Sequence, residues 1–148
     1  MHIPRSQETL PFPPIPFRGG IVFDENPMVS ITVCVRDGVD WVDECLESLA
    51  SQTYRPLEII AIDDGSSDGT AVQAQVVQAA FPGQVQVISH DTNRGIGAAL
   101  KTGFGHATLP WLTLMPADGQ IPPDGLSRLF APAMADPQLE LVTCHYPT

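Results

Sequence analysis

Apolar and polar positions follow two different periods along the chain, and their alternation predicts strands separated by helices. Runs rich in β-branched residues predict strands over 29–35, 57–62, 84–89 and 111–115, with a fifth over 139–144. Between them, helical patterns cover 39–52, 70–80, 96–107 and 122–134. The first of these helices places Val42, Cys45, Leu46 and Leu49 on one face.

This alternation is typical of βαβ units. We therefore expect an α/β fold, a three-layer αβα sandwich with a mainly parallel, Rossmann-like sheet and helices on both faces. Residues 29–148 should form one domain, preceded by a proline-rich arm over residues 1–28. The density of proline in the arm excludes a regular helix or a central strand. Two interpretations stay open: an extended arm, or an arm that docks on its own domain, a partner or a membrane.

Acidic residues follow four successive predicted strands. They are Asp37, the pair Asp63 and Asp64, Asp91, and Asp118. Because ligands of open α/β sheets bind at the carboxyl ends of the strands, these acids should meet at one edge. Aspartate is also an ordinary loop and helix-cap residue, and we expect Asp68 and Asp124 to be such caps. For Asp37 and Asp91 both interpretations stay open.

The residue types at this edge suit a nucleotide. A carboxylate can accept a hydrogen bond from a base, and the oxygens of Asp118 and Gln120 suit Mg²⁺ or Mn²⁺. The loop Asn93-Arg94-Gly95 precedes a helix, where backbone N–H groups can approach an anion. The sequence has neither the P-loop pattern nor G-x-G-x-x-G after the first strand, which disfavours P-loop NTPases and dehydrogenases.

Charge and cysteine content narrow the partners. The chain has 17 acidic residues against 7 Lys plus Arg, a net charge of −10, which argues against nucleic acid. The 3 cysteines have no C-x-x-C spacing, so we expect reduced packing residues. We see neither a membrane-spanning run nor a secretory signal and expect a cytoplasmic protein.

Two stretches resemble a known family. VSITVCVRDGVDWVDECLESLASQTYRPLEIIAIDDGSSDGT resembles the N-terminal half of family-two glycosyltransferases of the GT-A fold. NRGIGAALKTGFGHATLPWLTLMPADGQIPPDGLSRL resembles the branch that loads sugars onto polyprenyl phosphates, the dolichol-phosphate mannosyltransferase type. The resemblance implies a UDP- or GDP-linked sugar donor, Mg²⁺ or Mn²⁺, and inverting transfer. The acceptor implied by the resemblance is a hydroxyl or a phosphate, and the polyprenyl-phosphate branch implies a lipid phosphate reached by a protein peripheral at a membrane surface.

On this resemblance each motif position has an implied role. Asp63 and Asp64 match the nucleotide-binding acids, and Asp37 stands where the family has Asn. The loop of Asn93, Arg94 and Gly95 matches the loop near the donor. Asp118 matches the second acid of the D-x-D metal motif, and Gln120 the glutamine that follows it.

Three departures weaken the expectation of activity. Pro116 stands at the first D-x-D position, so one metal ligand is missing. Cys34, Arg36 and Asp37 replace the usual Pro, Tyr and Asn, and Arg36 would either contact diphosphate or only balance nearby acids. The chain also ends near the fifth strand, before the family's acceptor-binding segments.

Two main hypotheses remain open. One is a metal-dependent glycosyltransferase, and the other is a catalytically silent remnant that binds nucleotide sugar or a partner. A receiver-like signalling domain is disfavoured, because the acid pair follows the second strand instead of the first. An open sheet edge would favour a homodimer.

Overall fold

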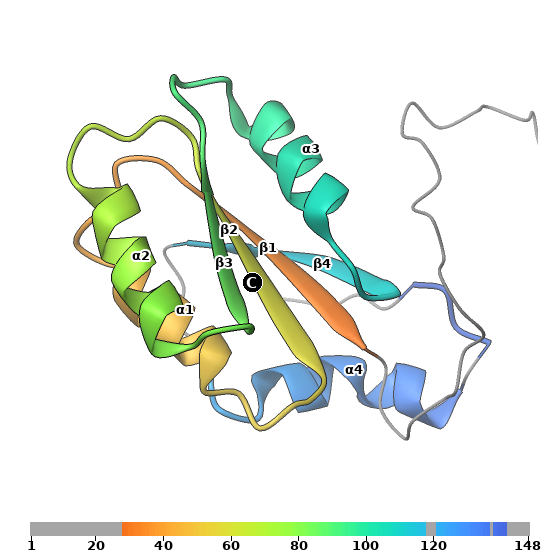
Figure 1. The fold of residues 1–148 in the computed structure, drawn as a ribbon. Coiled ribbons are helices and arrows are strands. Elements are labelled where there is room, and N and C mark those ends of the chain that lie inside the picture. Colours follow the sequence, from red (N-terminus) through yellow and green to blue (C-terminus); the bar gives the residue numbers. More distant parts are fainter. Residues whose placement is uncertain (1–27, 118–120, 137, 142–148) are drawn as a thin grey trace, which may run out of the picture.

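The chain folds around a parallel sheet of four strands in the order β3-β2-β1-β4 (Figure 1). The computed structural model describes residues 28–117, 121–136 and 138–141. The elements are β1 (Val29–Val35), α1 (Val42–Ala50), β2 (Leu57–Asp63), α2 (Thr70–Ala80), β3 (Val85–Ser89), α3 (Ile96–His106), β4 (Trp111–Pro116) and α4 (Gly125–Ala135). The predicted α/β class with a parallel sheet is confirmed.

Helices cover both faces of the sheet, as the three-layer prediction required. Alternate residues of a strand face opposite sides. Accordingly Ile59 and Ala61 of β2 join the core cluster that contains residues of α1, α2 and α4. Ile60 and Ile62 join a smaller cluster with Ala99 of α3. Figure 1 shows α3 on the side of the sheet opposite α1 and α2.

The strand register brings the carboxyl ends together. Val35 of β1 pairs with Asp63 of β2, and Asp63 pairs in turn with Ser89 of β3. On the other side of β1, Cys34 pairs with Pro116 at the end of β4. The loops that follow all four strands therefore leave the sheet at one edge, which we call the carboxyl rim.

Helix α3 lies unusually close to β1. A Cβ atom added at Gly103 would stand 2.2 Å from Cγ2 of Thr32, so only glycine permits this approach. The glycines that weaken the helical pattern of this segment thus include one that packs the helix against the sheet.

Some predicted boundaries were wrong. Helix α1 begins at Val42 and not at residue 39, because the N–H groups of Trp41 and Val42 both bond to the carbonyl of Gly38 in a turn. Helix α4 begins at Gly125, after the two prolines that were expected to open it. Residues 139–141 are not in a strand, and the rest of the expected fifth strand lies outside the described residues.

Other predictions can be followed only in part. Residues 1–27 of the expected arm, together with Cys144, lie outside the described residues. Cys34 and Cys45 are free thiols, as expected. Within the described ranges, no helix combines the length and the apolar character needed to cross a membrane.

Candidate functional site

The two adjacent acids at the end of β2 belong to opposite faces of the sheet. Asp63 continues the alternation of Ile59 and Ala61, and its Oδ1 accepts the N–H of Ser66 on the way to α2, at 3.3 Å. Asp64 contacts the loop before α3 instead. Both residues are buried, with 3% and 5% exposure. The two carboxylates accept hydrogen bonds from different loops, Asp63 from Ser66 and Asp64 from residues 90–95.

The Asp64 carboxylate is held by three donors. Its Oδ1 accepts the backbone N–H of Arg94 at 2.9 Å and lies 2.7 Å from Nδ1 of His90. Its Oδ2 accepts the backbone N–H of Gly95 at 2.8 Å. The sequence predicted that these N–H groups would approach an anion. In the described residues the anion at this helix start is Asp64 itself, so the loop is tied to the end of β2.

These contacts lower the pKa of Asp64. Burial opposes ionisation, but the hydrogen bonds from His90, Arg94 and Gly95 and the nearby His90 ring favour the carboxylate and outweigh it. Gly95 immediately precedes α3, and the positive end of that helix favours a negative charge at this position. The carboxylate is therefore the stable form at neutral pH.

Gly65 lets this loop pass over the end of β2. The residue has φ +72°, and a Cβ atom there would lie 2.4 Å from the carbonyl carbon of Thr92 and 2.5 Å from the nitrogen of Asn93. Both the backbone conformation and the close approach thus require glycine. The Asp64-Gly65 pair is what places the loop of residues 90–95 at the rim.

A second set of contacts joins the loops after β1 and β2. The N–H of Asp37 donates to Oγ of Ser66 at 2.8 Å, and the N–H of Ser67 donates to Oδ1 of Asp37 at 3.0 Å. Asp37 has a φ of 50°, and Nε of Arg36 lies 3.8 Å from its Oδ2 at the exposed surface. Asp37 therefore lies beside the loop that follows Asp63.

Asp68 is structural, but not as the predicted helix cap. The N-cap position of α2 is Gly69, and Asp68 precedes it. Its carboxylate accepts the N–H of Thr70 at 3.0 Å and the N–H of Val39 at 3.2 Å, and the hydroxyl of Thr70 also donates to it. The Thr70 hydroxyl bond is the main reason why the pKa of Asp68 is lowered. Asp124 does occupy the N-cap position of α4, but its side chain makes no capping hydrogen bond.

A small cleft of about 160 Å³ opens between the end of β1 and the start of α3. Its lining includes Cys34, Arg36, Asp64, Asn93 and Gly95. Burial, followed by the nearby charge of Asp64, raises the pKa of Cys34 to about 11. The thiol therefore stays protonated at neutral pH and is not a nucleophile.

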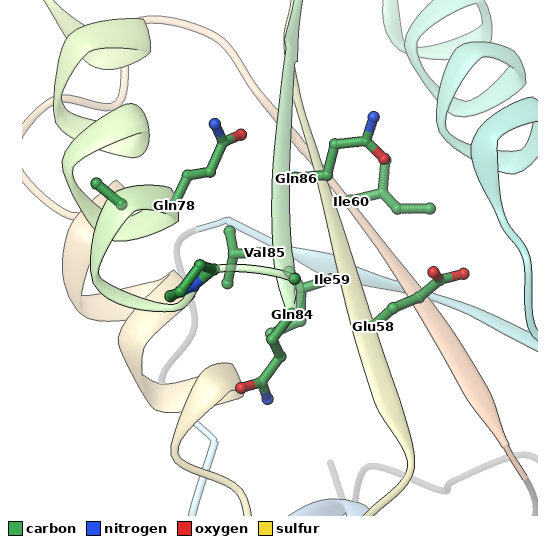
Figure 2. A pocket seen from close by; sticks show the side chains of 10 residues that line it. Glu58, Ile59, Ile60, Gln78, Gln84, Val85 and Gln86 are labelled. Carbon is green, nitrogen blue, oxygen red and sulfur yellow. The ribbon is translucent and has the colours of Figure 1, made fainter.

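A larger hollow of about 520 Å³ lies at the amino ends of β2 and β3 (Figure 2). Figure 2 shows three glutamines around it, Gln78, Gln84 and Gln86, with Glu58 as its one acid. Glu58 is already occupied, because it accepts bonds from Thr108 N–H and from the hydroxyl groups of Ser30 and Thr108. Size alone would select this hollow, but the charged and loop residues that could bind a nucleotide gather at the other end of the sheet.

The metal prediction cannot be followed in space. Asp118 and Gln120 lie outside the described residues. Pro116 ends β4 and brings no side-chain oxygen to the rim. The described residues contain no group of three or more His, Cys, Asp or Glu that could hold a metal ion. Asp118 and Gln120 as metal ligands therefore stay a prediction.

The structure brings the six described residues of the predicted nucleotide site to one rim. Asp64, Asn93, Arg94 and Gly95 form one group through the bonds of Asp64, and Asn93 Oδ1 also accepts the N–H of Gly95 at 3.0 Å. Asp37 and Asp63 form the other, linked through Ser66. Their contacts with a ligand remain a prediction.

Two contributors were not predicted from the sequence. They are His90, which bonds to Asp64, and Ser66, which bonds to Asp37 and Asp63. The signal for His90 was its position directly after β3, which a parallel sheet places beside the end of β2.

The parallel sheet, the acid pair after β2 and the glycine turn before α3 together form an α/β domain with a candidate site at its carboxyl rim. Residues 30–147 match the family model "Glycosyl transferase family 2", and the chain belongs to that family.

Relatives and solved structures agree with this assignment. The EpsH protein of Bacillus subtilis is 33% identical over 122 residues, which are 82% of this chain and 34% of that protein. The succinoglycan biosynthesis protein ExoO of Rhizobium meliloti is 32% identical over 113 residues, 76% of this chain and 31% of ExoO. The chain thus spans about a third of the length of these curated relatives.

A solved structure has a similar fold over most of this chain. The mannosyltransferase PcManGT from Pyrobaculum calidifontis, in complex with GDP-Man and Mn²⁺, matches with a TM-score of 0.70 and 26% identity. The match covers 77% of this chain and 34% of that one. The GT-A fold predicted from the sequence is thereby confirmed.

Proposed function

We propose that the carboxyl rim binds the nucleotide part of a UDP- or GDP-linked sugar, and that the chain is the donor-binding part of an inverting glycosyltransferase. The observation that carries this proposal is the tie between Asp64 and the N–H groups of Arg94 and Gly95. It holds the loop before α3 against the rim and leaves a cleft lined by Arg36 and Asn93 beside it.

Asp63 is the acid that we assign to the base of the nucleotide. Among the described residues its carboxylate accepts one hydrogen bond, a long one of 3.3 Å from Ser66. Carboxylate oxygens have about four lone-pair sites, so Asp63 keeps acceptor capacity for a base N–H. Asp64 has three donors and acts on the ligand through the loop that it holds.

Arg36 and Asn93 are placed to contact the rest of the donor. Both line the cleft, and the Arg36 side chain is 52% exposed, so its guanidinium can turn from Asp37 toward a diphosphate. Asp37 then stabilises the loop after β2 through Ser66 and Ser67.

Mg²⁺ or Mn²⁺ would be held by Asp118 and Gln120 together with donor phosphates. When bound, the ion would neutralise the charge that develops on the leaving diphosphate. The solved structure of PcManGT with GDP-Man and Mn²⁺ supports a cation of this kind.

For the acceptor we propose a polyprenyl phosphate at a membrane surface, reached by a cytoplasmic or peripheral protein. A phosphate acceptor is already ionised, whereas a hydroxyl acceptor needs a general base. Transfer to a phosphate therefore needs no general base from the protein.

A catalytically silent nucleotide-binding domain is the second candidate. Pro116 favours it, since the residue at the end of β4 supplies no ligand oxygen to the rim. Replacing it by aspartate separates the two candidates. If Pro116→Asp tightens Mn²⁺-dependent nucleotide binding and produces sugar transfer that the unmodified chain lacks, the unmodified chain is silent because it lacks a metal ligand at this position.

The test of the proposal is calorimetric titration of the chain with UDP and GDP, with and without Mn²⁺. We expect one nucleotide to bind, with higher affinity when Mn²⁺ is present. Asp63→Asn should weaken binding by roughly tenfold or more, the effect of a lost hydrogen bond to a charged group. Asp91→Asn is the matched control, because Asp91 is an exposed acid on the same rim. Absence of binding by the folded chain would contradict the proposal.

A further inference from the structure

His90 connects the ends of β3 and β2 with helix α3. Its ring lies directly after β3, with a side chain only 5% exposed. Nδ1 is 2.7 Å from Oδ1 of Asp64, and Nε2 is 2.9 Å from Oγ of Thr102 in α3. The Thr102 hydroxyl in turn lies 3.0 Å from the carbonyl of Ala98, one turn earlier in the helix. Both ring nitrogens thus face protein partners.

The main chain of His90 is held as firmly as its ring. Its N–H donates to the carbonyl of Asp63 at 2.8 Å. The ionised carboxylate of Asp64 can only accept, so Nδ1 carries a hydrogen and donates it. The donated hydrogen fixes the rotation of that carboxylate, whose Oδ2 then faces the N–H of Gly95.

We infer that His90 is a positioning residue of the nucleotide site: it orients Asp64, and through Asp64 the loop of Arg94 and Gly95, against α3. The inference rests on the proposed function for the identity of the ligand. The contacts that carry it are those of the free chain. A buried ring with both nitrogens engaged does not reach the ligand, so its action on binding passes through Asp64.

Two amide substitutions divide the roles of the two ring nitrogens. In His90→Asn the side-chain N–H₂ stands close to the position of Nδ1 and can still donate to Asp64. In His90→Gln the N–H₂ reaches toward the position of Nε2 and Thr102, and the bond to Asp64 is lost. His90→Ala removes both.

His106→Gln is the matched control. His106 also contacts Thr102, with its Nδ1 2.8 Å from the Thr102 carbonyl. Unlike His90, it is exposed and lies in the last turn of α3. The four variants should first be compared with the unmodified chain by circular dichroism, so that an unfolded variant is recognised.

The first readout is hydrogen exchange of the Arg94 and Gly95 amides in the ligand-free chain. We expect His90→Ala and His90→Gln to speed this exchange by roughly tenfold or more, because the bonds to a charged acceptor are weakened. His90→Asn and His106→Gln should leave it within about threefold. If His90→Ala does not fold, the Asn and Gln variants still give the decisive comparison.

The second readout is the affinity for UDP and GDP, which should change in the same order across the variants. Unchanged exchange in His90→Gln and His90→Ala would overturn the role of His90, whatever the affinities are. Altered exchange with no nucleotide binding even by the unmodified chain would keep the role in the loop and overturn the nucleotide function instead.

Discussion

Helix α3 is tied to strand β2 at both ends by a carboxylate, and the two ties differ in what lies beside them. At the carboxyl rim, Asp64 accepts the N–H groups of Arg94 and Gly95 before the helix. At the opposite edge of the sheet, where β2 begins, Glu58 accepts the N–H and O–H of Thr108, which follows the carboxyl end of the helix. The rim tie is buried and lies next to the cleft with Arg36, whereas Glu58 is half-buried beside a hollow lined by amides.

The comparison teaches that one structural device serves two purposes. A carboxylate that accepts hydrogen bonds from a loop stabilises the fold at either edge of the sheet. Of the two loops, the one at the rim lines a cleft that also contains the Arg36 and Asn93 side chains, which are able to contact phosphate. Substitutions at the two ends should therefore differ in their effect on nucleotide binding more than in their effect on stability.

The largest effect is expected at Gly65. Gly65→Ala should lower the free energy of unfolding by roughly 2–5 kcal/mol, because it adds an unfavourable positive φ to a collision with the backbone of Thr92 and Asn93. Nucleotide binding should be lost with it. Chemical denaturation and calorimetric titration measure both effects.

Gly83 provides the matched control at the amino-end hollow. It has φ +77°, but no atom lies within 4 Å of an added Cβ. Gly83→Ala should therefore cost only about 1–2 kcal/mol of strain and leave nucleotide affinity unchanged. Equal losses in the two variants would show that the close approach at Gly65 is unimportant.

The next effect is expected from neutralising the two carboxylates. Asp64→Asn should lower stability by about 2–3 kcal/mol, because an amide brings N–H groups against donors that need acceptors. Its nucleotide affinity should fall by roughly tenfold or more. Urea denaturation and calorimetry provide the two numbers.

Glu58→Gln is the corresponding change at the other end of the helix. The residue is half-buried, so we expect a loss of about 1 kcal/mol. Nucleotide affinity should not change. A fall in affinity as large as that of Asp64→Asn would mean that the two ends of α3 are not functionally distinct.

The smallest expected effect is the contribution of Asp64 to the pH dependence of stability in the acidic range. A pKa that is lower in the folded state than in the unfolded state contributes stability above the unfolded value, about 3.9 for aspartate. That contribution is lost as the pH falls from about 4 through the lower folded value. Unfolding measured between about pH 5 and 3 should therefore be less pH-dependent in Asp64→Asn than in the unmodified chain, and an identical dependence would exclude a lowered pKa.

The sequence predicted the sheet and the rim well because both depend on local patterns. The β-branched runs defined β1 to β4 closely, and parallel strands must bring Asp63, Asp64 and the loop before α3 to one edge. The nucleotide interpretation of these residues came from the resemblance and from the residue types together.

The contacts of the rim could not be predicted, because they join residues distant in sequence. Asp64 and Gly95 are 31 positions apart, and the pairing of their atoms depends on how the loop passes over Gly65. For the same reason the role of His90 was missed. The start of α2 was predicted correctly, but Gly69 occupies the N-cap position, and Asp68 one residue earlier bonds to Thr70 and Val39.

The most direct test is titration of the isotope-labelled chain with UDP and GDP in the presence of Mg²⁺, followed by the chemical shifts of assigned backbone amides. We expect the changes to gather at the carboxyl rim, at Arg36, Asp37, Asp63 and residues 93–95. Amides around the amino-end hollow, at residues 83–86, should stay unchanged. Changes confined to the hollow, or none at either end, would contradict the assignment of the rim as the nucleotide site.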